Sequence, residues 1–185
     1  MRKAPAAALP QQELATALLG KDEIDDAEAA FHTALASAPD PESRVMIYSN
    51  LGNLYRRKSQ YARAVDSFRK GIAITAHPTL FHNLGMTEMA LAQRASMAGE
   101  TQLAIAHVNQ ARDAFESALK TGSGPAAQEV FFQWEPAKTH ALLGQVLFSL
   151  GDRSGAREHL EKALQLEPAG PVADLTRQYM QRLDQ

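Results

Sequence analysis

Residues 48–68, YSNLGNLYRRKSQYARAVDSF, hold the pattern that decides the fold. Apolar residues recur three and four positions apart in its first half, which is the spacing of one face of an α-helix. These positions are Tyr48, Leu51 and Tyr55. Gly52 stands twelve positions before Ala64, and Phe68 follows one helical turn later. We expect two helices that cross closely at Gly52 and Ala64, with Phe68 filling the space beside the crossing.

The same spacing of twelve positions between two small side chains returns twice in the chain. The corresponding pairs are Ala15 with Ala27 and Gly144 with Ala156, and the large residues beside them are Phe31 and Leu160. The pattern resembles the tetratricopeptide repeat, a helix–turn–helix unit of about 34 residues. The resemblance implies an all-α, right-handed solenoid, in which each hairpin buries its apolar face against the next.

The repeat pattern divides the chain into hairpins and connecting segments. We expect four tetratricopeptide-like hairpins at about residues 10–40, 41–77, 78–121 and 136–168, with a C-terminal capping helix at 171–183. The capping helix carries Val172, Leu175, Tyr179 and Leu183 at helical spacing. A tail at residues 1–9 and an insert at 122–135 are the remaining parts of one domain that spans residues 10–185.

The third hairpin departs from the common spacing, because the distance in sequence from Gly85 to the corresponding Ala111 is more than twice that in the other repeats. Gly99 supplies a turn. The separation in sequence between Gly85 and Gly99 is twice the separation between the small residue and the turn in the neighbouring repeats. We therefore predict an elongated hairpin with about two extra turns on each helix. A rival interpretation treats residues 99–118 as two short helices, but neither proline nor a second glycine interrupts that stretch.

The charge is unevenly distributed, although the net charge is only −2. Residues 11–42 hold eight acidic residues and one lysine, whereas residues 43–77 hold seven basic residues and one aspartate. We expect the two hairpins to attract each other across solvated faces, and a polarised partner surface is the alternative. The net charge argues against a general nucleic-acid binder, and no apolar run is long enough for membrane insertion.

Cysteine is absent, which excludes disulfides and thiolate chemistry but leaves the cellular compartment open. Residues 1–10 have a basic start but lack the apolar core of a signal peptide. The localisation is therefore unknown. The cytoplasm is slightly favoured, and a periplasmic protein whose leader was removed is the alternative.

In the family that the chain resembles, the first helix of each repeat lines a concave groove that binds an extended peptide. The resemblance assigns ligand contact to Ser49, Asn53, Arg56, His82, Asn83, Met86, Met89, Lys138 and Gln145. One branch of the family grips a C-terminal carboxylate with a set of lysine, asparagine and arginine residues. Asn53, Asn83 and Lys138 match that set, but Ser49 and Leu142 stand where two of its three cations belong.

Two further features of the sequence leave alternatives open. Met86 and Met89 suit adaptable apolar recognition, or they pack beneath the long hairpin or the insert. Phe131, Phe132 and the only tryptophan, Trp134, cluster in the insert. This cluster either covers a side of the long hairpin or acts as an aromatic anchor for a partner.

The sequence contains no arrangement that carries catalysis. The six histidines form no HExxH motif, and no nucleophile elbow, phosphate loop or dinucleotide fingerprint is present. We therefore expect no enzyme, no cofactor and no metal. The prediction is a non-enzymatic adaptor or chaperone-like module that binds a protein segment or peptide. The alternatives are a self-associating, homo-oligomeric scaffold, and a regulatory or assembly domain of a larger complex.

Overall fold

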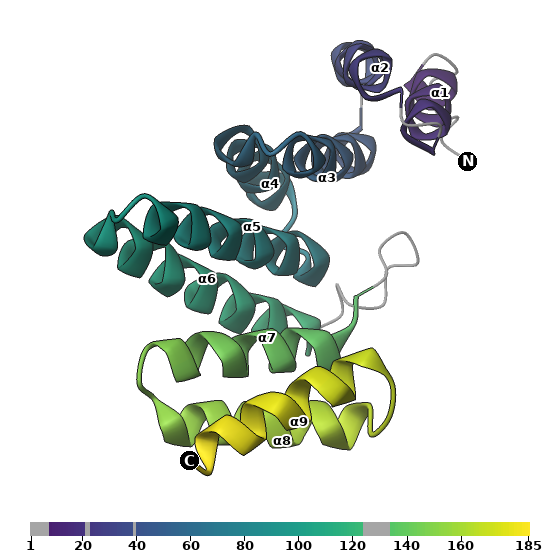
Figure 1. Ribbon diagram of the computed structural model, residues 1–185. Coiled ribbons are helices and arrows are strands. Elements are labelled where there is room, and N and C mark those ends of the chain that lie inside the picture. The colour runs from purple at the N-terminus through teal and green to yellow at the C-terminus, as the bar shows by residue number, and fades with distance from the viewer. Residues whose placement is uncertain (1–7, 21–22, 39, 124–133) are drawn as a thin grey trace. The chain divides into compact units, whose positions relative to one another are not determined.

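The structure, a computed structural model, describes residues 8–20, 23–38, 40–123 and 134–185 of the 185-residue chain. The elements in these ranges are helices, which pair in chain order as hairpins (Figure 1). They are α1 (Ala8–Gly20), α2 (Ile24–Ser37), α3 (Pro41–Arg57), α4 (Tyr61–Ile74), α5 (Pro78–Met97), α6 (Thr101–Gly122), α7 (Pro136–Ser149), α8 (Arg153–Leu166) and α9 (Pro171–Leu183). The predicted all-α class, with four hairpins and a final helix, is confirmed.

The contacts between residues divide the chain into two compact units. The N-terminal unit, Met1–Ala76, contains α1 to α4, and the C-terminal unit, His77–Gln185, contains α5 to α9. Each unit has buried apolar residues of its own. One continuous domain over residues 10–185 stays a prediction, as does the insert, most of which lies outside the described residues.

Most helices begin where the sequence places a cap or a proline. Asp40 accepts a hydrogen bond from the backbone N–H of Ser43 at 2.7 Å, and Pro41 takes the first helical position of α3. Proline also stands at the start of α5, α7 and α9. Helix α1 begins two residues before the expected start, with Pro10 inside its first turn, where the lack of a backbone N–H breaks no intrahelical hydrogen bond.

The predicted close crossings are present in three hairpins. A Cβ atom added at Gly52 would lie 2.5 Å from Phe68, and one at Gly85 would lie 2.7 Å from Phe115. The third crossing has the same form, because a Cβ atom at Gly144 would lie 2.7 Å from Leu160. All three large side chains are fully buried. A glycine is needed at each crossing because any side chain there would overlap its neighbour.

The third hairpin has the two longest of these helices, with 20 residues in α5 and 22 in α6, against 17 and 14 in α3 and α4. The turn falls at Ala98, Gly99 and Glu100, and Gly99 has a φ of +75°, a conformation that glycine adopts at little cost. The elongated hairpin is thus confirmed, and the rival interpretation of two short helices over residues 99–118 is wrong.

The added part of this hairpin has an interior of small residues and one acid. Ala92, Ala95 and Ala104 are buried between α5 and α6. Glu88 is only 1% exposed, and its Oε2 lies 2.7 Å from His107 Nδ1. The amide nitrogen of Gln110, once its side chain is turned, lies 2.9 Å from the same oxygen. A carboxylate can remain buried here because it accepts hydrogen bonds from α6.

Helix α9 packs on α7 and α8 and covers the end of the C-terminal unit, as a capping helix should. Ala173, Thr176 and Leu183 are buried, and Tyr179 meets the ring of Phe148 edge-on at 6.2 Å. Leu175, which was expected on the apolar face, is 40% exposed. The smaller Ala173 and Thr176 make the contact instead.

Candidate peptide-binding surface

Three side chains of α3 occupy positions that the resemblance assigns to ligand contact. We call such positions the groove side of a helix. Ser49 is buried, at 3% exposed, so its hydroxyl does not face solvent. Asn53 and Arg56 are half-buried on the same helix. The side-chain oxygen Oδ1 of Asn53 is buried, and no hydrogen-bond donor reaches it among the described residues.

An unsatisfied buried amide oxygen is uncommon in folded proteins, and it costs about 1–3 kcal/mol. Asn53 therefore carries a side-chain acceptor that stays unsatisfied among the described residues. Arg56 lies one turn further along α3, and burial of its guanidinium lowers its pKa below the ordinary value. A partly desolvated arginine interacts strongly with a carboxylate, because water competes less for the charge.

The groove side of α5 serves a different purpose. His82 is 8% exposed, and its Nδ1 lies 2.8 Å from Oγ1 of Thr139 on α7. Met86 and Met89 are half-buried and pack against the core cluster of the C-terminal unit, which agrees with the packing alternative. Asn83 is half-buried. These side chains hold α5 against its neighbours, and their role in ligand contact stays a prediction.

On α7, Lys138 and Gln145 are half-buried. The Nζ atom of Lys138 lies 3.7 Å from a carboxylate oxygen of Glu135, three residues earlier. Ala141 is buried between them on the helix, and Phe148 packs against the core cluster and Tyr179. The polar groove side of α7 is therefore reduced to Lys138 and Gln145.

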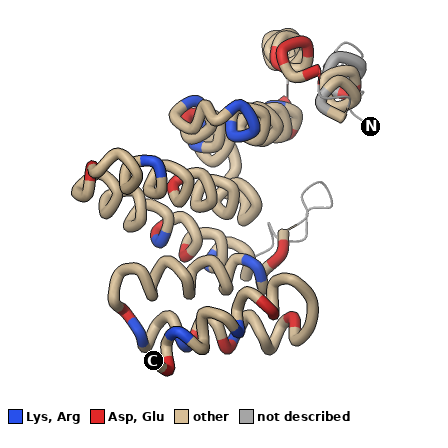
Figure 2. Tube along the Cα trace, in the orientation of Figure 1, with Lys and Arg blue, Asp and Glu red and all other residues tan. Residues whose placement is uncertain are grey.

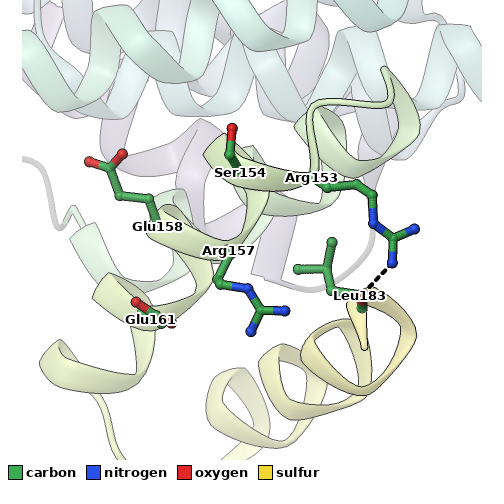
Figure 3. Close-up of a pocket in the computed structure, with 6 residues that line it drawn as sticks. All are labelled: Arg153, Ser154, Arg157, Glu158, Glu161 and Leu183. Atoms are coloured by element: carbon green, nitrogen blue, oxygen red, sulfur yellow. Dashed lines mark hydrogen bonds between the residues drawn. The ribbon is translucent and has the colours of Figure 1, made fainter. Parts of the chain in front are cut away.

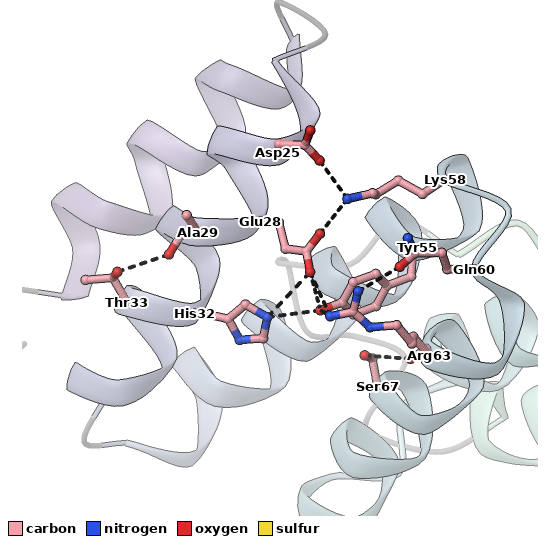
Figure 4. A network of polar contacts seen from close by, with 10 residues as sticks. All are labelled: Asp25, Glu28, Ala29, His32, Thr33, Tyr55, Lys58, Gln60, Arg63 and Ser67. Atoms are coloured by element: carbon pink, nitrogen blue, oxygen red, sulfur yellow. Dashed lines mark hydrogen bonds and ion pairs between the residues drawn. The ribbon is translucent and has the colours of Figure 1, made fainter.

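A polar network joins α2 to α3 and α4 in the N-terminal unit (Figure 4). The two carboxylate oxygens of Glu28 lie 2.7 Å from Lys58 Nζ and 2.7 Å from Arg63 Nη2. The Tyr55 hydroxyl donates a hydrogen bond to Glu28, and Lys58 also forms an ion pair with Asp25 at 2.7 Å. The expected attraction between the acidic first hairpin and the basic second hairpin is confirmed at this contact.

The pKa values in this network follow from its geometry. Burial raises the pKa of Glu28, but hydrogen bonds from Lys58 and Arg63 outweigh that effect, so the net pKa lies below the ordinary value. Burial and the nearby Glu28 raise the pKa of Tyr55. Glu28 is therefore ionised and Tyr55 protonated at neutral pH, and neither is poised for acid–base catalysis.

Of the aromatic cluster, Trp134 belongs to the described residues, whereas Phe131 and Phe132 lie outside them. Trp134 is half-buried, and its indole N–H donates to Oγ1 of Thr139 at 3.0 Å. A Cβ atom at Gly122 would overlap the indole ring, so the ring lies flush on the end of α6. These contacts support the cover interpretation for Trp134, since its polar atom and one part of its ring are engaged within the C-terminal unit.

A hollow of about 460 Å³ lies between α8 and the end of α9 (Figure 3). Arg153 donates to the backbone carbonyl of Leu183, and Arg157 Nη2 lies 2.6 Å from a carboxylate oxygen of Asp184. Both arginines lie near the C-terminal end of α9, where positive charge complements the helix dipole. These residues, which sequence analysis missed, attach the capping helix to α8.

Sequence analysis also missed a contact between two histidines on α7 and α8. Nδ1 of His140 lies 2.9 Å from Nδ1 of His159, and the rings stack with centroids 5.1 Å apart. Burial, with His159 and Lys162 nearby, lowers the pKa of His140 to about 4.

Among the described residues, no group of three His, Cys, Asp or Glu side chains could hold a metal ion. The described helices also include none long and apolar enough to cross a bilayer.

Two family models of the tetratricopeptide repeat match the chain, one at residues 13–78 and the other at 137–169. Together they cover more than half of the chain, so the chain belongs to the tetratricopeptide repeat family. No curated protein matches it in sequence. Proteins with this repeat are in general non-enzymatic scaffolds that bind other proteins or peptides.

Solved structures show the same fold at low sequence identity. A tetratricopeptide repeat protein from Parabacteroides merdae aligns with 97% of this chain at a TM-score of 0.71 and 15% identity. The chain spans 61% of that protein's length. A thermophilic repeat protein of Thermus thermophilus aligns with 96% of this chain at a TM-score of 0.65 and 21% identity, and the match covers 85% of its own length.

The second repeat domain of human RPAP3 is also similar, and it was solved in complex with the HSP70 peptide SGPTIEEVD. It aligns with 79% of this chain and 99% of its own length, at a TM-score of 0.58 and 20% identity. Identities this low show a shared fold alone.

Proposed function

We propose that this chain is a non-enzymatic adaptor that binds an extended segment of a partner protein on the groove side of α3. The observation that carries the proposal is the buried Oδ1 of Asn53, which no donor reaches among the described residues. A backbone N–H of a bound peptide would satisfy that atom and remove a cost of about 1–3 kcal/mol. The RPAP3 domain, which has the same fold, is a precedent for a bound peptide.

The chemistry of the surface defines the kind of peptide. Asn53 offers both a donor and an acceptor for peptide backbone, and Arg56 offers a planar cation for a carboxylate. Unlike a complete carboxylate-binding set, α3 carries Ser49 in place of a lysine, and that serine is buried. We therefore favour recognition of backbone amides with one acidic group over capture of a chain terminus.

The test begins with selection of random dodecapeptides on the full chain, followed by synthesis of the best binders and measurement of their affinity by calorimetry. The double variant Asn53→Ala with Arg56→Ala should weaken binding by about tenfold or more, because two polar contacts are lost. Asn53→Ala alone should not lower the melting temperature, because it removes a buried acceptor that is unsatisfied in the free chain.

The matched control is Asn109→Ala, which removes an asparagine from α6, where its amide bonds only to the preceding turn. It should leave the affinity unchanged. Unchanged affinity in the Asn53 and Arg56 variant, for every selected peptide, would contradict the proposal and move the site elsewhere.

Self-association is a second candidate function. Large apolar side chains are exposed near the turn of the long hairpin: Met97 is 82% exposed, Leu103 is 47% exposed and Ile105 is 46% exposed. Large exposed apolar side chains can mark an interaction site when they belong to one patch. Light scattering coupled to size-exclusion chromatography tests this candidate. A dimer that dissociates in the variant Leu103→Glu with Ile105→Glu would support self-association. A monomer at all concentrations would exclude it.

A further inference from the structure

A second hollow lies in the N-terminal unit, away from the groove side of α3. It has a volume of about 330 Å³ and is lined by Pro41, Arg44, Tyr48, Lys70, Ala73 and Ile74. We call it the Arg44 pocket. The first three residues belong to the first two turns of α3 and the last three to the end of α4. Since Asn53 follows Arg44 by nine residues, it projects from the opposite side of the helix.

The charges that line this pocket are not equally available. The Nζ atom of Lys70 lies 2.7 Å from a carboxylate oxygen of Asp66, one turn earlier on α4. Arg44 is exposed and has no hydrogen bond or ion pair with the residues that the structure describes. Because Asp66 offsets Lys70, the pocket carries about one net positive charge, centred on Arg44.

Two other basic residues of the same unit form ion pairs. Lys58 and Arg63 are neutralised by Asp25 and Glu28 in the network of Figure 4. Figure 2 shows acidic positions on α2 and basic positions on α3 and α4. Acidic residues of α2 thus neutralise part of the excess positive charge in residues 43–77. Arg44 takes no part in these ion pairs.

The rest of the pocket is apolar and aromatic. Ile74, Ala73 and Pro41 provide carbon surface, and the half-buried Tyr48 also lines the pocket. Arginine and tyrosine dominate the binding energy of many protein interfaces. A volume of this size lies at the lower end for ligand pockets and accommodates one or two side chains.

We propose that the Arg44 pocket binds an acidic segment of a partner protein, in which an aspartate or glutamate stands beside an apolar residue. The carboxylate would receive two parallel hydrogen bonds from the Arg44 guanidinium, and the apolar neighbour would pack on Ile74 and Tyr48. A single net positive charge matches one carboxylate better than a doubly charged phosphate. This proposal does not depend on the groove side of α3.

The test uses random dodecapeptides displayed on phage and selected on the full chain. Peptides that bind here should be enriched in Asp or Glu adjacent to Leu, Ile, Met or Phe. For the synthesised peptides, Arg44→Ala with Lys70→Ala should raise Kd by about tenfold or more. Added salt should weaken binding, and inorganic phosphate should compete poorly.

Two controls separate this pocket from general electrostatics and from the groove side. Arg94→Ala with Lys120→Ala removes two exposed cations from the C-terminal unit and should leave Kd unchanged. Asn53→Ala with Arg56→Ala should also leave it unchanged. Arg44→Lys keeps the positive charge but cannot donate two parallel hydrogen bonds to one carboxylate. The affinity of this variant for the peptide should therefore fall between those of the parent and the alanine variant.

Since Arg44 and Lys70 are exposed, their replacement should not unfold the chain, and circular dichroism checks this directly. Failure to select acidic peptides would overturn the proposal. So would acidic peptides whose affinity does not change with Arg44→Ala and Lys70→Ala, or that phosphate displaces completely.

Discussion

In the hairpin α3–α4, Gly52 faces Phe68, and in the hairpin α5–α6, Gly85 faces Phe115. A Cβ atom added at either glycine would lie at nearly the same short distance from the facing ring, 2.5 Å and 2.7 Å. The two hairpins thus share one crossing, although the separation in sequence of Gly85 and Ala111 is more than twice that of Gly52 and Ala64. The added residues lie beyond the crossing, toward the turn at Gly99. The crossing is therefore set by the small and large residues that meet there, and helix length is free to vary.

The same two hairpins differ in how they use the groove side. On α3, Asn53 has a buried oxygen that no described residue bonds, and Arg56 is half-buried. On α5, His82 bonds to α7, and Met86 and Met89 pack on the core of the C-terminal unit. Equivalent positions of a repeat are therefore not equally available to a ligand, and the comparison favours α3 as the binding helix.

The largest expected effect tests whether the two crossings are equivalent. Phe68→Ala and Phe115→Ala should each lower the free energy of unfolding by about 3–5 kcal/mol, because each removes a fully buried ring beside a glycine that cannot fill the space. Urea unfolding followed by circular dichroism measures both. Phe81→Ala, at a half-buried position, is the control and should cost less. A cost below about 1 kcal/mol for Phe115→Ala would break the comparison.

A smaller change in the free energy of unfolding is expected for two glutamates, Glu88 within the long hairpin and Glu28 on α2 next to the hairpin α3–α4. Glu88→Ala removes a carboxylate that is 1% exposed and accepts hydrogen bonds from His107, and should cost about 2–3 kcal/mol. Glu28→Ala removes ion pairs nearer to solvent and should cost about 1 kcal/mol or less. The same urea experiment measures both. Equal costs would mean that the added part of the long hairpin is not held by its buried acid.

Acid titration examines the Glu28 network separately. Because the folded pKa of Glu28 lies below its ordinary value of 4.5, the network adds stability above that pH and loses it as the pH falls through the folded pKa. The parent and Glu28→Ala should therefore differ in stability at pH 7 and converge toward pH 2, measured by urea unfolding across this range. A difference that persists at the acidic end would show that packing, and not ionisation, accounts for the effect of Glu28.

The smallest effect lies in the turns. The hairpin α3–α4 turns at Ser59 with a φ of +56°, whereas the long hairpin turns at Gly99 with a φ of +75°. A left-handed conformation costs a residue with a Cβ atom roughly 1 kcal/mol. Ser59→Gly should therefore stabilise the chain by up to about 1 kcal/mol, and Gly99→Ser should destabilise it by a similar amount. Thermal melting of the two variants checks the sign, and a loss of stability for Ser59→Gly would contradict the expectation.

The sequence predicted the fold well because the deciding signals are local. Spacings of small and large residues located the crossings, prolines marked the starts of α3 and α9, and Gly99 located the long turn. The site was less predictable. The burial of His82 depends on Thr139, 57 residues away, so helical periodicity alone could not show it.

The buried pair of Glu88 and His107 was missed for a similar reason, since it depends on the length of the hairpin. One signal could have found it. Glu88 follows Gly85 by three residues, as Tyr55 follows Gly52, so an acid stands where the pattern expects a buried residue. A buried acid needs donors from a neighbouring helix, and α6, the second helix of the same hairpin, supplies them.

The most direct test of the central claim is an NMR titration of the ¹⁵N-labelled chain with a selected peptide whose affinity does not depend on Arg44. Backbone amide shifts report which helix the peptide contacts. If the groove side of α3 is the binding surface, the largest shifts fall between Ser49 and Arg56, and Asn53→Ala with Arg56→Ala reduces them at the same peptide concentration. Largest shifts between His82 and Met89, with none on α3, would contradict the account.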